Sequence, residues 1–242
     1  IVFGDWSSDV CSSDLWSHNG QEYSKAPVLF SHLCQSNWEK LENSTLKSPF
    51  YFHRFFPHQP DLNYHTPEVL AEMTKILAFW AKHGVDGFRA DAVSFLWKEE
   101  GTDCANLPQM HWILAFFRAA LDYLKPGTIL LAEACQKPEE IKRYFGTPEL
   151  PECQAAYHFP LIPAIYKSLA EESPEAIIHA LSPQQTPAIQ NESQWFVFLR
   201  CHDELNFEML SRDEYEPIHK MYCHDTRWNF REIGRASCRE RV

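Results

Sequence analysis

The chain has 242 residues, with 22 Lys and Arg against 33 Asp and Glu, so its formal net charge at pH 7 is -11. This acidic balance argues against a protein that coats nucleic acid and against a polybasic membrane anchor, because both need a basic surface. Hydrophobic residues make up 45% of the chain, but no apolar run approaches the roughly 18 residues of a membrane span, so we expect neither nucleic-acid nor membrane partners.

The two ends of the chain differ in composition from the rest. Residues 7–14 read SSDVCSSD, and residues 231–242 contain four Arg. Both ends resemble translated sequencing-adapter sequence, and ordinary disordered tails are the alternative. We therefore expect residues 1–15 and 231–242 to be a non-native leader and tail, which would make residues 16–230 a fragment of a longer reading frame.

The first half of the chain contains two predicted helices and one predicted strand. Residues 16–65 are loop-like. A helix is predicted to start at Thr66, a capping residue followed by proline, and to end before Gly84, with apolar residues every three or four positions between them. A short strand over residues 85–92 and a second helix over residues 106–124 follow.

The second half continues the alternation of strands and helices. Strands are predicted over residues 128–132, 155–161 and 194–199, and helices after Pro138 and over residues 163–170. Two of these strands are apolar at nearly every position, which is typical of a parallel sheet that is covered on both faces. The pattern predicts an α/β fold.

Three carboxylates directly follow predicted strands. Asp91 and Glu133 are 42 residues apart, and Glu133 and Asp203 are 70 residues apart, close to one and two βα units. Because the C-terminal ends of strands in a parallel barrel meet on one face, we expect these side chains to line one pocket. Each could instead be a helix cap or a surface charge, and Arg89 with Asp91 could be a structural ion pair.

Cleavage of a glycosidic bond needs such carboxylates, one to attack the sugar carbon and one to protonate the leaving oxygen. Glu133 follows the most apolar of these strands, and burial favours the protonated form of a carboxyl, so Glu133 is our candidate acid. Arg89 lies two residues before Asp91, on the same side of the strand, and favours an ionised Asp91. His202 and Asp203 are adjacent, so one can hold a sugar hydroxyl while the other faces the reacting carbon.

Four motifs resemble, in order and spacing, those of the α-amylase family of glycoside hydrolases. Residues 87–93 (GFRADAV) resemble its nucleophile motif, and residues 129–134 (ILLAEA) its acid/base motif. Residues 198–204 (FLRCHDE) resemble its third-carboxylate motif, and residues 60–64 (PDLNY) a motif near the end of its protruding domain. The resemblance covers roughly residues 16–230 and implies a retaining mechanism.

The resemblance also implies a role for each candidate residue. Asp91 is the nucleophile, Glu133 the acid/base and Asp203 the stabiliser of the transition state. Arg89 orients the nucleophile, and His202 binds substrate hydroxyls. The implied substrate is a small α-glucoside, maltose or a related sugar.

The implied fold is a (β/α)8 TIM barrel, of which the chain contains only a part. The family's earliest motif is absent, so we expect about strands four to seven, over residues 66–230. Residues 16–65 are assigned to the remains of the protruding loop-rich domain. Because a partial barrel has open edges and an uncovered core, we expect this chain by itself to be neither well folded nor active.

Within the family, the sequence resembles the trehalose synthases, and this resemblance implies conversion of maltose to trehalose. The similarity lies in residues 36–38, 52–64, 157–163 and 199–205. The residues alone do not distinguish this mutase from a hydrolase, so an α-glucosidase, an amylase-type hydrolase or a sucrose-acting enzyme stays an alternative. A non-catalytic amylase-like binding subunit is the last alternative.

No cofactor is required for this chemistry. The family commonly binds calcium between the barrel and the protruding domain, which leaves a structural calcium open for the full-length protein. Asp61 and Asn63 are candidate ligands, but we prefer a turn before the Thr66 helix for both.

The eight cysteines have no CxxC spacing and predict free thiols, a cytoplasmic location and no zinc site. Cys135 and Cys201 lie near the catalytic motifs and are expected to be buried and inert. Cys201 stands where the family usually has Asn, which puts a substrate hydrogen bond at that position in doubt.

Overall fold

The computed structural model describes residues 13–31, 34–42, 49–199, 207, 210–223, 229–230 and 233–234. They belong to two compact units, Ile1–Ile129 and Leu130–Val242, each of which is described by itself. Most of the predicted leader and tail lies outside the described residues. The predicted boundaries at residues 16, 66 and 230 therefore stay predictions.

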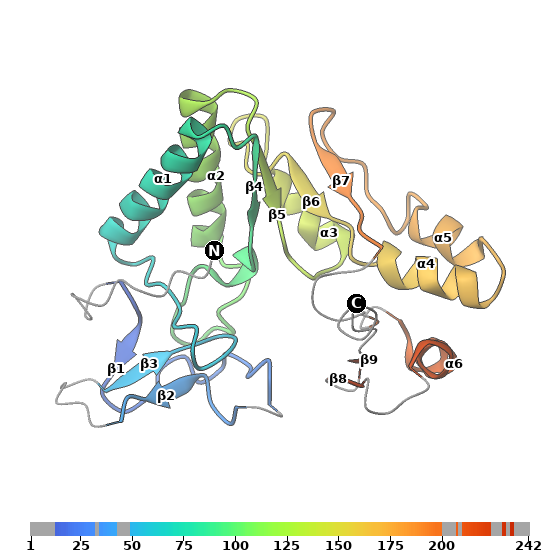
Figure 1. Ribbon diagram of the computed structural model, residues 1–242, viewed down its shortest axis with the longest axis horizontal. Helices are drawn as coiled ribbons and strands as arrows, with labels where there is room; N and C mark the ends of the chain where they lie inside the picture. Colours follow the sequence, from blue (N-terminus) through green and yellow to red (C-terminus); the bar gives the residue numbers. More distant parts are fainter. Residues whose placement is uncertain are drawn as a thin grey trace. The chain divides into compact units, whose positions relative to one another are not determined.

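A small antiparallel sheet forms in the first unit, where the sequence indicated only loops (Figure 1). Its strands are β1 (Trp16–Ser17), β2 (Trp38–Lys40) and β3 (Phe50–Phe52), in the order β1-β3-β2. Phe52 pairs with Trp38 in register and is fully buried in a cluster with Leu15, Ala26 and Cys104. Phe52, the last residue of the aromatic strand β3, thus belongs to the core beside this sheet.

Two helices of the first unit confirm the predicted apolar periodicity. Helix α1 (Pro67–Lys82) and helix α2 (Pro108–Leu124) pack side by side (Figure 1). Each begins with proline, which has no N–H group. This suits the first turn of a helix, where N–H groups have no carbonyl partner within the helix. Gly84 follows α1 with a φ of +96°, a backbone conformation that is energetically unfavourable for residues with a Cβ atom. Strand β4 (Gly87–Ala90) and the short 3-10 helix η1 (Val93–Phe95) lie between the helices in the chain.

Helix α2 has apolar residues on both of its faces. Met110 and Leu121 are fully buried, as the amphipathic pattern predicts. On the other face, Trp112, Phe116 and Tyr123 are 63%, 46% and 88% exposed. This exposed aromatic face of α2 is an apolar surface patch.

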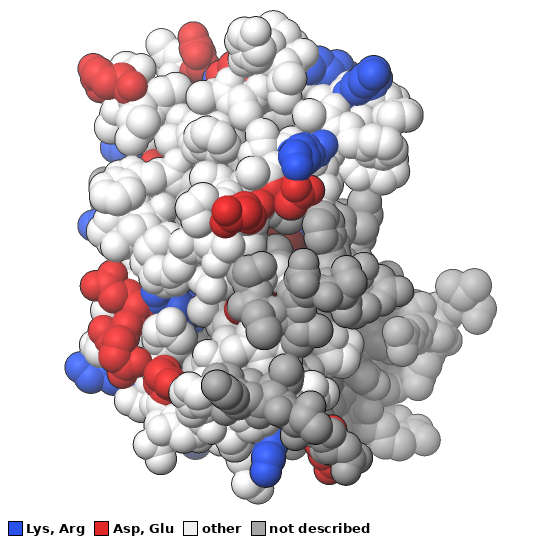
Figure 2. Space-filling view, turned by 90° about the vertical axis from the view of Figure 1, so that its left-hand side faces the viewer, with Lys and Arg blue, Asp and Glu red and all other residues white. Residues whose placement is uncertain are grey.

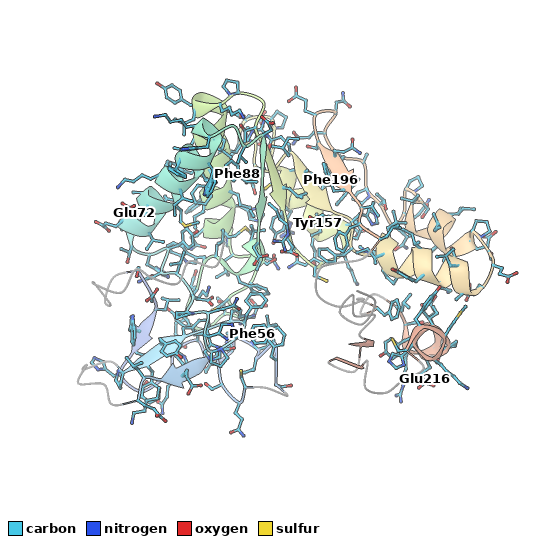
Figure 3. All side chains as sticks on the ribbon, viewed as in Figure 1. Phe56, Glu72, Phe88, Tyr157, Phe196 and Glu216 are labelled. Carbon is cyan, nitrogen blue, oxygen red and sulfur yellow. The ribbon has the colours of Figure 1, made fainter. Side chains whose placement is uncertain are left out.

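A parallel sheet confirms the α/β prediction. Strands β5 (Ile129–Ala132), β6 (Ala155–Tyr157) and β7 (Gln194–Phe196) run parallel, and the strand order of the sheet is β4-β5-β6-β7. Tyr157 and Phe196, both labelled in Figure 3, are register partners on β6 and β7. Both strands end earlier than the predicted ranges 155–161 and 194–199.

The remaining elements of the second unit are mainly short helices. They are α3 (Pro138–Ile141), η2 (Lys142–Phe145), α4 (Leu161–Ala170), α5 (Glu175–Ala180) and α6 (Arg212–Tyr222), followed by the hairpin strands β8 (Asn229–Phe230) and β9 (Ile233–Gly234). Helix α4 begins at Leu161, two residues earlier than predicted, because Pro163 is tolerated in the first turn. Helices α5 and α6 were not predicted.

A sharp turn after η2 depends on glycine. Gly146 has a φ of +71°, and a Cβ atom at this position would lie 2.2 Å from the carbonyl oxygen of Leu150. Gly146 forms an isolated bridge with Pro151, and the N–H of Glu152 donates to the carbonyl of Phe145. The close approach of the two backbone segments therefore excludes any side chain at residue 146.

The surface carries charges of both signs. The face shown in Figure 2 carries both acidic and basic side chains, separated by uncharged residues. No helix among the described residues is long and apolar enough to cross a membrane. In the same part of the chain, the cysteines are free thiols: Cys34, Cys104, Cys135, Cys153 and Cys223.

Candidate active site

Asp91 directly follows the last residue of β4, as predicted. The alternation along the strand puts Phe88, labelled in Figure 3, on the more buried side, and Arg89 and Asp91 on the more exposed side. The chain then turns at Ala92, whose φ of +48° lies in the left-handed region. Such a conformation is rare for residues with a Cβ atom and tends to occur at functional sites.

Arg89 and Asp91 form an ion pair. The Nη2 atom of Arg89 lies 2.8 Å from Oδ1 of Asp91, and the two side chains are 33% and 71% exposed. A charge-assisted hydrogen bond of this length restricts the rotation of the carboxylate while leaving much of it open to a ligand. This arrangement suits a carboxylate that must present an oxygen to an electrophilic carbon.

Glu133 directly follows β5 in the second unit, again as predicted. Ala132 and Ala134 on either side of it are buried, and Glu133 is partly buried. Cys135 is exposed, so the prediction of a buried, inert thiol at this position was wrong. After the end of β5 the chain leaves the sheet, and the side chain of residue 135 is no longer covered.

The remaining predicted site residues are not described by the structure. His202, Asp203 and Cys201 lie outside the described residues, so their roles stay predictions. The structure therefore brings together one predicted pair, Arg89 with Asp91, and places Glu133 at the strand end where it was expected.

A buried polar network in the first unit was missed by the sequence analysis. Arg54 and Lys98 are 2% and 3% exposed, and both contact Asp61. The N–H of Arg54 donates to Oδ1 of Asp61 over 2.8 Å, and the ammonium of Lys98 lies 2.5 Å from Oδ2. The guanidinium of Arg54 donates to the carbonyl of Asp103 and lies over the ring of Phe95.

The residues around Asp61 also test the suggestion of a calcium site. The side chain of Asn63 accepts the N–H of His65, and its carbonyl accepts the N–H of Thr66, so Asn63 forms the predicted turn before α1. Asp61 instead belongs to the network with Arg54 and Lys98. Among the described residues, no three His, Cys, Asp or Glu side chains are placed to hold a metal ion together.

A second buried polar chain lies in the second unit, within the residues 157–163 that carry the family resemblance. Nδ1 of His158 accepts the N–H of Leu161, so Nε2 carries the proton and donates to Oγ1 of Thr186 over 2.6 Å. Thr186 in turn donates to the carbonyl of Ala180. Burial lowers the pKa of His158, which keeps the imidazole neutral.

Asp91, paired with Arg89, follows β4 in the first unit, and Glu133 follows β5 in the second. Carboxylates are the groups that glycoside chemistry uses. The family is given by comparison with known proteins. The model of the α-amylase catalytic domain matches residues 5–222. The chain therefore belongs to the α-amylase family, a family of glycoside hydrolase enzymes.

Known relatives extend well beyond this chain. The trehalose synthase/amylase of Mycolicibacterium smegmatis is 43% identical over 215 residues, which are 88% of this chain and 35% of that protein. The trehalose synthase of Pimelobacter sp. is 39% identical over 220 residues, 88% of this chain and 38% of that protein. The solved isomaltulose synthase of Erwinia rhapontici, at 21% identity, gives a TM-score of 0.55 and covers 69% of this chain and 32% of that chain, which supports the fold.

Proposed function

We propose that the full-length protein is a trehalose synthase, which converts maltose to trehalose through a covalent glucosyl intermediate on Asp91. The observation that carries the proposal is the ion pair of Arg89 with Asp91 at the end of β4, in a chain that is 43% identical to a trehalose synthase/amylase over 88% of its length. The relatives' names concern proteins of which this chain matches 35–38%, so the activity of the whole protein is a proposal.

The proposed reaction is a double displacement at one sugar carbon. In the first step, a carboxylate oxygen of Asp91 attacks the anomeric carbon of the non-reducing glucose, while Glu133 gives its proton to the leaving oxygen. The bond between that carbon and the glycosidic oxygen breaks, and glucose is released in the pocket. Asp203 stabilises the positive charge of the transition state, and His202 holds sugar hydroxyls.

The second step reverses the roles with a turned acceptor. Glu133, now ionised, takes the proton of the anomeric hydroxyl of the retained glucose, and this oxygen attacks the glucosyl carbon. The ester bond to Asp91 breaks and trehalose is formed. Water is the competing acceptor, so the yield of trehalose depends on how well the pocket excludes it.

We further propose that the described sheet is part of a (β/α)8 barrel, about strands four to seven, and that residues 16–65 belong to a protruding domain. The order β4-β5-β6-β7 and the solved relative support this reading. A cytoplasmic location is supported by the free thiols of the described cysteines, which are typical of a reducing compartment.

The proposal is tested by incubating the full-length protein with maltose and separating trehalose from glucose by chromatography. Trehalose as the main product, lost in Asp91→Asn, supports the synthase. Glucose as the only product identifies a hydrolase of the same family. Unchanged maltose, with binding detected by calorimetry, would identify a non-catalytic binding subunit and overturn the proposal.

A further inference from the structure

The ammonium group of Lys98 is a buried cation with a complete set of partners. Lys98 is 3% exposed, and its Nζ atom lies 2.5 Å from Oδ2 of Asp61. It also donates to the carbonyl oxygen of Phe95 and lies 5.7 Å from the centre of the Phe52 ring, within cation–π range. A carboxylate, a main-chain carbonyl and an aromatic face therefore surround one positive charge.

Two of these partners are oxygens of the kind that a calcium ion prefers. The family resemblance raised a calcium near Asp61, yet both oxygens of this carboxylate are already in use. Oδ1 accepts the N–H of Arg54, and Oδ2 is bound to Lys98. A divalent ion at Asp61 would have to displace the ammonium or lie directly against it, and the repulsion between buried like charges opposes both. The residues present thus do not fit a calcium ion.

We propose that Lys98 serves as a built-in cation at Asp61, so that this part of the protein is held together without a metal ion. Lys98 comes from the segment that follows Asp91 and η1, and Asp61 precedes α1. Arg54, from the chain just after β3, binds the same carboxylate. One carboxylate therefore ties together three segments of the first unit, including the one that continues from the nucleophile strand.

The inference concerns stability and does not depend on the proposed activity. A first experiment uses the unaltered full-length protein and its Asp61→Asn variant, with calcium chloride and EDTA as probes in a thermal unfolding assay. We expect the change in Tm that calcium or EDTA produces to be the same in the unaltered protein and in Asp61→Asn, because no calcium ion binds at Asp61. A calcium-dependent rise in Tm that Asp61→Asn abolishes would overturn the proposal.

A second experiment converts the ammonium into a ligand. In Lys98→Glu, two carboxylates replace the ion pair, and we expect a lowered Tm that calcium raises again by several degrees, on the order that binding to the folded state alone produces. In Lys98→Met, residue 98 has neither the ammonium group of lysine nor the carboxylate of glutamate. This variant should be destabilised without a response to calcium. Lys125→Glu, at the exposed Lys125–Asp86 pair, is the matched control and should not respond either.

The pattern across the variants decides the matter. A calcium response of Lys98→Glu alone supports a cation position that the lysine fills. Equal responses of Lys98→Glu and Lys125→Glu, or none in a folded Lys98→Glu, would overturn the claim that this position accepts a cation. If Lys98→Glu does not fold, the experiment on the unaltered protein and Asp61→Asn still decides whether calcium acts at Asp61.

Discussion

The Nη2 atom of Arg89 lies 2.8 Å from Oδ1 of Asp91, and both side chains leave the same side of the chain at the end of β4. Because Asp91 is 71% exposed, the contact holds one carboxylate oxygen and leaves the other accessible. In the proposed mechanism Asp91 is the nucleophile and Arg89 orients it, and each side chain can be altered separately.

We expect Asp91→Asn to lower kcat of the full-length protein on maltose by on the order of 10⁴-fold or more, because the proposed covalent step would lose its nucleophile. Arg89→Lys should lower kcat by about 10²-fold, because an ammonium cannot reproduce the geometry of the guanidinium. Arg118→Lys makes the same change in the Arg118–Asp122 pair on α2 and should leave kcat unchanged. Equal losses in Arg89→Lys and Arg118→Lys would contradict a specific role for Arg89.

Burial of His158 makes the folded state sensitive to mild acid. Its pKa is lowered from 6.5 in the folded protein, so the unfolded chain binds the proton more readily. The stabilising effect of the neutral imidazole is complete above about pH 6.5 and is lost as the pH falls below this value towards the folded pKa. We expect Tm to fall between pH 7 and pH 5, and this fall to be smaller in His158→Gln. His83→Gln, which removes an exposed imidazole, is the control substitution.

Glu214 makes a second pH-dependent contribution to the stability of the folded state, at lower pH than that of His158. Its carboxylate binds Lys167 and accepts the hydroxyl and N–H of Ser211, the cap of α6, which lowers its pKa from 4.5 to about 2. The resulting stability is present above about pH 4.5 and is lost as the pH falls towards 2.

Because Glu214 is 38% exposed, we expect Glu214→Gln to cost only about 0.5–1 kcal/mol at pH 7. The difference from the unaltered protein should shrink as the pH falls below 4.5, as measured by chemical denaturation. Glu216→Gln on the same helix, labelled in Figure 3, makes the same substitution at an exposed position and is the control. A pH-independent cost at Glu214 would contradict an electrostatic origin.

Gly146→Ala should destabilise the protein more than Gly127→Ala. Both glycines have positive φ, +71° and +87°, so both substitutions carry a similar backbone cost, about 1 kcal/mol. Only at Gly146 would the new Cβ atom collide with a backbone oxygen, whereas nothing lies within 4 Å at Gly127. The difference between the two Tm changes therefore measures the steric term, and equal changes would show that the turn relaxes freely.

The sequence predicted the elements with a strong local pattern. The apolar periodicity of α1 and α2 and the continuous apolar run of β5 were sufficient to locate them within a few residues. The strand ends then placed Asp91 and Glu133 correctly, since each carboxylate follows a strand that its own neighbours define.

Elements that depend on distant contacts were not predictable in the same way. β1, β2 and β3 have only two or three residues each, and their pairing across the chain leaves no period in the sequence. Helix α6 contains Pro217, which normally argues against a helix interior. Lys98 belongs to a charged run with Glu99 and Glu100, which indicates a solvated segment until the position of Asp61 is known.

The exposed aromatic face of α2 has a practical consequence for handling the protein. A net charge of -11 makes the molecules repel one another at low ionic strength. The exposed side chains of Trp112, Phe116 and Tyr123, in contrast, form an apolar surface that favours association. At 0.1 M salt, the repulsion between charges more than about 10 Å apart is largely screened, whereas the apolar attraction remains. Solutions of this chain should therefore become turbid as salt is raised, and dilute buffers are the better choice for storage.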